Sequence, residues 1–129
     1  MTQKPIYKVI IAGGRDFNDY NLLKDKVNKI LKEKRLTHNI VIVSGCARGA
    51  DTLALRYASE NVLNVEEYPA DWEKYGKKAG YLRNAQMAEV SDALIAFWDG
   101  ESKGTKHMID LATEKGLDIR VIKYNTKCG

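Results

Sequence analysis

Residues 40–51 read IVIVSGCARGAD, and this stretch indicates the fold class. The four consecutive β-branched residues from Ile40 to Val43 are typical of a buried strand in a parallel sheet. A turn of small residues follows, and apolar residues then recur at helical spacing between positions 50 and 58. The turn also carries Arg48. Because small residues let a ligand approach the backbone and arginine binds anions, we expect a negatively charged ligand at this turn.

The same strand–helix unit recurs on both sides of this stretch. Apolar runs at residues 6–12, 93–98 and 119–124 predict three further strands, and residues 62–68 predict a less apolar one. Helical patterns separate the strands. Their apolar positions are Leu23, Val27, Ile30 and Leu31 after an Asn18 or Asp19 cap, then Leu82, Ala85, Met87 and Val90, and then Thr105, Met108, Ile109 and Ala112 before Gly116.

Strands that alternate with helices are typical of a parallel sheet with right-handed crossovers. We therefore predict an α/β fold, a Rossmann-like three-layer sandwich with helices on both faces of a parallel five-stranded sheet. The expected strand order is 3-2-1-4-5. No linker or repeat interrupts residues 1–129, which we interpret as one domain. Residues 71–80 lack periodicity and are expected to form an ordered loop or a short helical turn.

The composition favours a globular protein of the cytoplasm. Hydrophobic residues make up 44% and charged residues 29% of the 129 residues, and the N-terminus has no secretory layout. No apolar run is long enough for a bilayer, so we expect no membrane partner. The formal net charge of +4 comes largely from lysines on predicted helix faces, and we therefore do not expect nucleic acid as a partner. Cys46 and Cys128 form neither a disulfide framework nor a zinc site.

Glycine-rich loops follow three of the predicted strands. Since the carboxyl ends of parallel strands share one edge of a sheet, and each loop opens a helix, we expect the loops to form one anion-binding site. The candidate residues are Gly13, Gly14, Arg15 and Asp16 in the first loop, Ser44, Gly45, Ala47, Arg48, Gly49 and Asp51 in the second, and Asp99, Gly100, Ser102, Gly104 and Thr105 in the third.

The segment after Pro69 adds a different set of candidates, namely Asp71, Trp72, Tyr75, Arg83 and Asn84. The two aromatic side chains are suited to stacking on a base, although packing of the loop on the sheet explains them equally well. Arg83 and Asn84 follow Gly80 near a predicted helix start, where they can contact a phosphate or a sugar.

Other kinds of site find little support in the sequence. None of the loops matches GxGxxG or ends in GK[ST], so dehydrogenase-type NAD binding and P-loop ATP hydrolysis are both disfavoured. Cys46 has no histidine nearby in the sequence, and neither His38 nor His107 has a partner at metal-ligand spacing. We expect no metal and no cofactor.

Four stretches in register, AGGRDF, SGCARGAD, DWEKYGKKAGYLRN and WDGESKGTKHMI, resemble the YspA-type, cpYpsA-related branch of the SLOG superfamily. That superfamily also holds the LOG phosphoribohydrolases and the DNA-processing protein DprA. The resemblance implies a Rossmann-like fold and a pocket for nucleotides or nucleotide-derived ligands. It implies ligand-facing positions at Gly14, Arg15, Ser44, Gly45, Arg48, Gly49, Asp51, Arg83, Asn84, Asp99, Gly100, Gly104 and Thr105.

One departure from the LOG pattern concerns catalysis. The LOG motif PGGxGTxxE ends in a glutamate that takes part in cleaving the N-glycosidic bond, and Met108 holds that place here. A thioether cannot act as a general base. The sequence leaves open whether Asp16, Asp51, Asp71 or Asp99 supplies a carboxylate instead.

The sequence is therefore compatible with three functions. The leading one is the binding or sensing of a mononucleotide, an NAD-derived molecule or an ADP-ribose-like ligand. The second is a nucleotide N-glycoside hydrolase with a relocated carboxylate. The third, single-stranded nucleic-acid binding as in DprA, is disfavoured by the mild charge and by the lack of a basic–aromatic stretch. A homo-oligomer is expected only by analogy.

Overall fold

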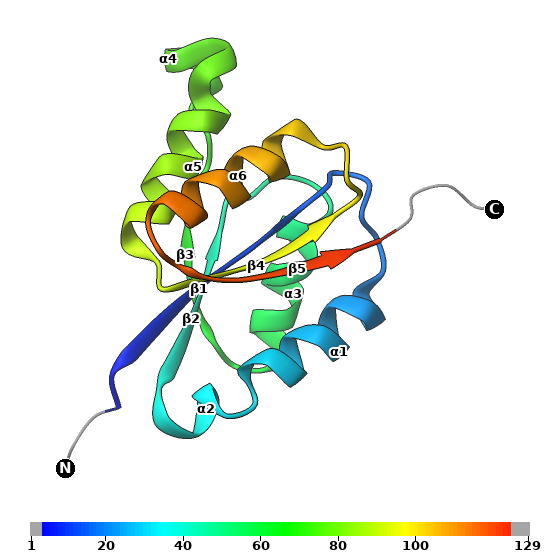
Figure 1. The fold of residues 1–129 in the computed structure, drawn as a ribbon, viewed down its shortest axis with the longest axis vertical. Coiled ribbons are helices and arrows are strands. Elements are labelled where there is room, and N and C mark those ends of the chain that lie inside the picture. The colour runs from blue at the N-terminus through cyan, green and yellow to red at the C-terminus, as the bar shows by residue number, and fades with distance from the viewer. Residues whose placement is uncertain (1–3, 125–129) are drawn as a thin grey trace.

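Residues 4–124 are described by the computed structural model, and within them five strands form one parallel sheet (Figure 1). The strands are β1 (Ile6–Gly13), β2 (Asn39–Ser44), β3 (Asn64–Glu67), β4 (Ala93–Trp98) and β5 (Asp118–Lys123). Their order is β3-β2-β1-β4-β5, and each neighbouring pair is parallel. The predicted α/β class, Rossmann-like fold and strand order are confirmed.

Helices cover both faces of this sheet. Helices α1 (Tyr20–Leu31) and α3 (Ala50–Glu60) pack on one face, and α5 (Ala79–Val90) and α6 (Lys103–Glu114) pack on the other (Figure 1). The short α2 (Lys34–Thr37) follows α1. Helix α4 (Trp72–Tyr75) and the 3-10 turn η1 (Gly76–Lys78) lead into α5 and project beyond the body of the fold.

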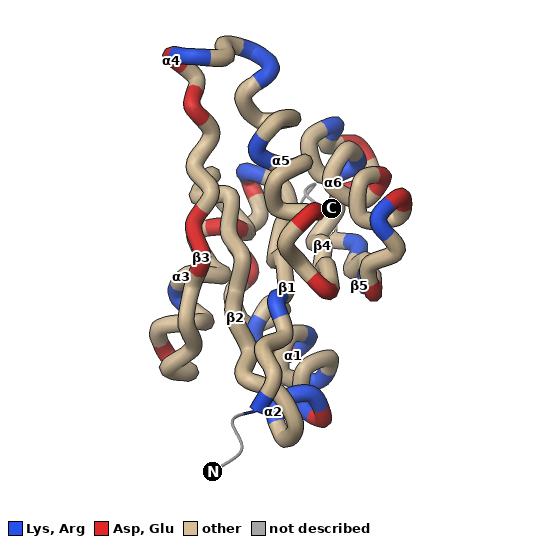
Figure 2. The backbone as a smooth tube through the Cα atoms, turned by 90° about the vertical axis from the view of Figure 1, so that its left-hand side faces the viewer, with Lys and Arg blue, Asp and Glu red and all other residues tan. Residues whose placement is uncertain are grey.

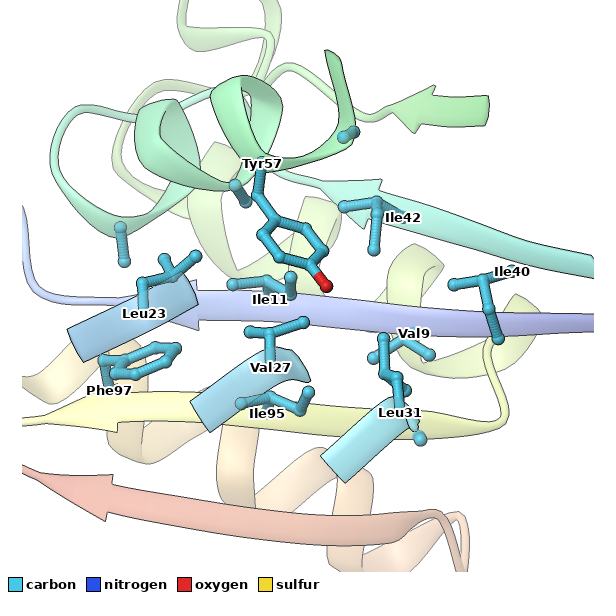
Figure 3. Close-up of a cluster of buried hydrophobic side chains, with 14 of the residues drawn as sticks. Val9, Ile11, Leu23, Val27, Leu31, Ile40, Ile42, Tyr57, Ile95 and Phe97 are labelled. Atoms are coloured by element: carbon cyan, nitrogen blue, oxygen red, sulfur yellow. The ribbon is translucent and has the colours of Figure 1, made fainter. Parts of the chain in front are cut away.

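The hydrophobic core is divided by the alternation of side chains along β1. Val9 and Ile11 face α1 and α3, where they meet Leu23 and Val27 (Figure 3). Ile10 and its neighbours on the same side of the sheet pack against Met87 of α5 and Met108 of α6. Burying an aliphatic side chain of this size stabilises the fold by about 1.5–3 kcal/mol. The two core clusters therefore hold the three layers together.

Two of the expected elements differ in detail. The third strand begins at Asn64, because Val62 is 92% exposed and adopts a positive φ of 54° in the turn after α3. In α5, the predicted apolar positions Leu82 and Val90 are exposed, whereas the predicted Met87 is buried together with Ala79, Asn84 and Ala88. The predicted apolar stripe was therefore wrong at Leu82 and Val90, since α5 packs on the core through Met87 and Ala88.

Caps begin the helices that border the loops. The Asp19 carboxylate accepts a hydrogen bond from the Leu22 N–H at 3.0 Å, which decides between the two predicted caps of α1. Asp71 accepts in the same way from the Lys74 N–H at 3.1 Å and starts α4. None of the helices within residues 4–124 combines the length and apolarity needed to cross a membrane. Cys128 lies outside the described residues.

Candidate ligand-binding site

A cavity of about 470 Å³ lies at the carboxyl edge of the sheet, where loops from distant parts of the chain meet. The β1–α1 loop, the start of α3, the α4–α5 segment and the start of α6 each contribute to it. Of the predicted site residues, it is lined by Gly13, Gly14, Arg15, Asp16, Ala47, Asp51, Trp72, Arg83, Asn84, Ser102, Gly104 and Thr105.

The first two glycine loops are joined by a backbone hydrogen bond next to this cavity. The Gly14 carbonyl accepts hydrogen bonds from the Ala50 N–H at 3.3 Å and from the Phe17 N–H at 3.2 Å. Gly49 has φ 79° and ψ −125°, and a Cβ there would overlap the Gly14 carbonyl oxygen. Because only glycine fits this backbone and this space, Gly49 holds the loops together and lies outside the cavity lining.

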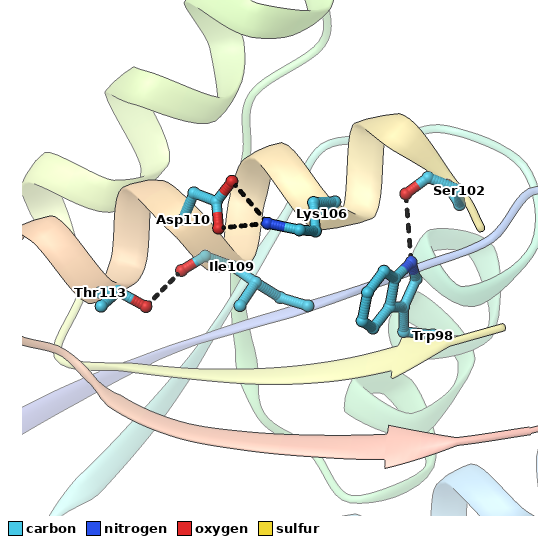
Figure 4. Close-up of polar contacts among 6 residues, drawn as sticks. All are labelled: Trp98, Ser102, Lys106, Ile109, Asp110 and Thr113. Atoms are coloured by element: carbon cyan, nitrogen blue, oxygen red, sulfur yellow. Dashed lines mark hydrogen bonds and ion pairs between the residues drawn. The ribbon is translucent and has the colours of Figure 1, made fainter. Parts of the chain in front are cut away.

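The third loop presents the start of α6 to the cavity. The Asp99 carboxylate accepts from the Glu101 and Ser102 N–H groups, each at 2.8 Å, and these donors lower the pKa of Asp99. The Trp98 indole donates to the Ser102 carbonyl at 3.1 Å (Figure 4). Ser102 caps the helix through the Thr105 N–H. Asp99 thus shapes the loop, and neither it nor Gly100 lines the cavity.

Two adjacent residues of α5 form hydrogen bonds with the loop after β2 and with the start of α6. The Arg83 guanidinium donates through Nη1 to the Gly45 carbonyl and through Nε to the Asn84 side chain at 3.0 Å. The Asn84 amide donates to the Gly104 carbonyl at 3.4 Å and lies 3.2 Å from His107 Nδ1. These contacts hold both side chains in fixed positions on the cavity wall.

Asp51 is a nearly buried carboxylate in the lining of the cavity, with 7% of its surface exposed. Its Oδ2 accepts from the Ala47 N–H at 3.1 Å. Burial raises the pKa of Asp51 to about 6, while the Ala47 N–H and the charge of Arg83 act in the opposite direction. Burial also lowers the pKa of Arg83, and the nearby charge of Arg15 contributes to this shift.

The remaining predicted residues lie elsewhere. Gly45 and Arg48 line a neighbouring hollow, and Asp71 and Tyr75 line another beside α5. Ser44 is fully buried, and its hydroxyl accepts from the Cys46 N–H at 3.1 Å. These residues therefore lie outside the lining of the main cavity. The sequence predicted that Arg48 would share one site with the other glycine loops, but in the structure it lines the neighbouring hollow.

The structure also adds residues that the sequence analysis missed. Lys77, Tyr81 and Met87 line the cavity together with Ala12 and Gly80. Tyr81 packs edge-on against His107, with ring centroids 4.5 Å apart. The alternation of aromatic and basic residues in WEKYGKKAGYLR, residues 72–83, is the signal that could have identified Lys77 and Tyr81.

Met108 occupies the inner wall of the cavity and is 1% exposed. It stands where the LOG motif has its glutamate, so this wall is apolar. Among the carboxylates named as replacements, Asp16 and Asp51 line the cavity, whereas Asp71 and Asp99 do not. Among residues 4–124, no three His, Cys, Asp or Glu side chains are grouped so that they could hold a metal ion.

A family model described as the YspA, cpYpsA-related SLOG family matches residues 7–75, more than half of the chain. The chain belongs to this SLOG family. The Gene 61 protein of Mycobacterium phage D29 is similar to it, with 38% identity over 118 residues, which cover 87% of this chain and 93% of the phage protein.

Solved structures of DNA processing protein A (DprA) share the fold. The Streptococcus pneumoniae protein matches with a TM-score of 0.72 and 20% identity over 94% of this chain and 52% of its own, so this SLOG chain spans about half of that DprA. Helicobacter pylori DprA matches with a TM-score of 0.66 and 21% identity over 94% of this chain and 67% of its own. At these low sequence identities, the two TM-scores show that the proteins share a fold.

The expectation that nucleic acid is not a partner was wrong. The H. pylori structure is described as revealing the single-stranded DNA binding mode of DprA, so this fold occurs in a protein that binds single-stranded DNA. The exclusion rested on the net charge and on a missing basic–aromatic stretch. Net charge averages over the surface, whereas binding depends on where the cations gather, and residues 72–83 contain the stretch that was overlooked.

Proposed function

We propose that this SLOG chain binds a nucleotide or nucleotide-derived ligand in the cavity at the carboxyl edge of its sheet. The observation that carries the proposal is the convergence of cationic side chains, a helix N-terminus and exposed aromatic rings on one cavity. Its volume of about 470 Å³ falls in the range of roughly 300–1,000 Å³ usual for small-molecule sites.

The anionic part of the ligand is assigned to the start of α6. Backbone N–H groups and the helix dipole make a helix N-terminus favourable for phosphate, and Ser102, Gly104 and Thr105 of this turn line the cavity. Arg15 and Arg83 add two guanidinium groups that can form charge-assisted hydrogen bonds with phosphate oxygens.

The base is assigned to the aromatic side chains that line the cavity. Trp72 and Tyr81 are 50% and 48% exposed, respectively, although both line the cavity. Large aromatic rings that are left this exposed next to a cavity are suited to stacking on a nucleobase. Apolar side chains such as Met87 and Met108 form the inner wall, where they can exclude water.

The test is titration calorimetry with AMP, adenosine and inorganic phosphate. Arg15 is exposed, so Arg15→Ala should leave folding intact. Loss of a hydrogen bond to a charged group costs about 1.5–3 kcal/mol, which weakens AMP binding by about 10- to 100-fold. Arg120→Ala is the matched control, because Arg120 lies on β5 and pairs with Asp118. Equal AMP affinity of the wild type and Arg15→Ala would contradict the proposal.

A second candidate function, single-stranded nucleic-acid binding, is favoured by the arm formed by α4, η1 and the start of α5. Three exposed rings, Trp72, Tyr75 and Tyr81, alternate there with Lys74, Lys77 and Lys78. Figure 2 shows basic residues along the projecting segment that begins at α4. Aromatic platforms interleaved with cations are the usual means of binding single strands.

Tyr75 distinguishes the two functions, because it is 45% exposed on the arm and does not line the cavity. Stacking of one base contributes about 1–3 kcal/mol, so Tyr75→Ala should weaken binding of a short oligothymidylate by about 5-fold or more. Fluorescence anisotropy at two salt concentrations measures this, and AMP binding by the same variant serves as the control. Oligothymidylate affinity that does not respond to Tyr75→Ala would rule out this surface.

A further inference from the structure

A second hollow of about 500 Å³ adjoins the cavity and shares part of its wall. Arg15, Ala47, Trp72 and Arg83 line both spaces. The second hollow is completed by Gly45, Cys46, Arg48, Pro69 and Ala70. Arg15 and Arg83 therefore form a ridge between two spaces, each of which has room for a nucleoside.

The charges around the second hollow are unbalanced. Three arginines line it, and no Asp or Glu does. Arg15 and Arg48 are exposed, and the ion pairs found among residues 4–124 involve neither of them. Arg83 is held against the Gly45 carbonyl, so its guanidinium is fixed in place before any ligand arrives. The Asp51 carboxylate lies near Arg83, but within the described residues Arg15 and Arg48 have no such counter-charge, so the positive charge around the second hollow favours an anion there.

The remaining wall of the second hollow is apolar. Pro69 and Ala70 form one side, and the Trp72 ring, half exposed, borders both spaces. A hollow for phosphate alone needs neither this volume nor this apolar side. The combination of an apolar wall with arginines on the ridge fits a nucleoside joined to a phosphate.

We propose that the second hollow is a subsite for a second nucleoside, so that the ligand is a dinucleotide with its linking phosphate on the Arg15–Arg83 ridge. This inference rests on the proposed function, because the first nucleotide occupies the main cavity. From the side of the second hollow, Arg48 contacts the phosphate of the link that AMP lacks. The link is a 5′–5′ pyrophosphate or a 3′–5′ phosphodiester, and both place negative charge on the ridge.

The experiment compares three probes by titration calorimetry, namely AMP, diadenosine diphosphate with its pyrophosphate link, and the phosphodiester-linked dinucleotide pApA. Wild-type protein should bind at least one dinucleotide about 10-fold or more tightly than AMP, and the tighter of the two identifies the link. Arg48→Ala should remove this gain and leave AMP affinity within about 2-fold, because Arg48 does not line the main cavity.

A second variant tests the hollow without changing its charge. Ala70→Leu fills part of the second hollow and should weaken dinucleotide binding while AMP binding is retained, and Arg120→Ala should change neither. If AMP binds and both dinucleotides bind no more tightly, the second subsite is overturned while the proposed function stands. If Arg48→Ala weakens AMP and the dinucleotides equally, the subsite is also overturned. If none of the three probes binds, the proposed function itself fails.

Discussion

Asp51 of α3 and Arg83 of α5 both lie against Gly45, at the position where another residue would carry its Cβ. A Cβ added to this glycine would come within 2.6 Å of Arg83 Nη1 and 3.0 Å of Asp51 Oδ2. The absence of a side chain at Gly45 lets a buried carboxylate and a half-buried guanidinium approach the same loop. The opposite charges then lie close together in the wall of the cavity, where burial strengthens their interaction.

Stability should depend on pH through Asp51. Burial raises the pKa of this carboxyl from 3.8 to about 6, so ionising it costs more free energy in the folded state than in the unfolded state. The contribution of Asp51 to the free energy of unfolding therefore falls as the pH rises from about 4 to about 6, and it stays low above that range. A pKa difference of about two units between the folded and unfolded states corresponds to a change of about 3 kcal/mol in the free energy of unfolding.

Asp51→Asn removes this titration and keeps an oxygen for the Ala47 N–H. The free energy of unfolding of the variant minus that of the wild type should therefore be larger at pH 7 than at pH 4, by up to about 3 kcal/mol. Urea unfolding at a series of pH values measures it. Unfolding free energies of wild type and variant that run parallel from pH 4 to pH 7 would show that Asp51 does not titrate in this way.

Gly49→Ala should destabilise the fold. The backbone there has φ 79°, and the new Cβ would meet the Gly14 carbonyl that joins the first two loops. A residue forced into such a conformation costs about 1–3 kcal/mol, and displacement of the carbonyl adds to this. Gly104→Ala is the control, because nothing lies within 4 Å of its added Cβ and alanine favours the helix. Equal melting temperatures for the two variants would refute the argument.

Nucleotide binding should be visible in tryptophan fluorescence. Trp72 is half exposed in the cavity wall, whereas Trp98 is partly buried and its indole donates to the Ser102 carbonyl. A base stacked on Trp72 should quench its emission during an AMP titration. Trp72→Phe should abolish the quenching, and Trp98→Phe should retain it. The reverse result would place the base away from Trp72.

The cavity should hold AMP without releasing adenine. Met108 lines it in place of the LOG glutamate, and a positioned acid or base contributes about 10²–10⁴-fold to such a reaction. Contacts that bind substrate and transition state equally do not lower the barrier. Chromatography after long incubation of AMP, NAD and ADP-ribose with the protein measures free base. Release above a buffer control that Asp51→Asn abolishes would instead make Asp51 a catalytic carboxylate.

The sequence alone was sufficient for the five strands of the sheet, for the long helices between them and for the fold class. Apolar runs such as residues 40–43 predict buried strands because side-chain periodicity reports local structure, and a cap such as Asp19 predicts a helix start for the same reason. The four motifs were sufficient for the family, which the family model and the phage relative show. The position of the glycine loops after parallel strands also predicted the edge at which the cavity lies.

The tertiary structure decided which loop residues meet. Arg83 reaches the Gly45 carbonyl across 38 residues of sequence, and Asp99 binds the backbone of its own loop, although both were predicted to face the ligand. The path of the chain from α4 to α5 brings Lys77 and Tyr81 to the cavity, and the β2–α3 loop places Arg48 in the second hollow. Periodicity describes contacts within one element, whereas a site depends on how separate elements pack against one another, and this information is not local in the sequence.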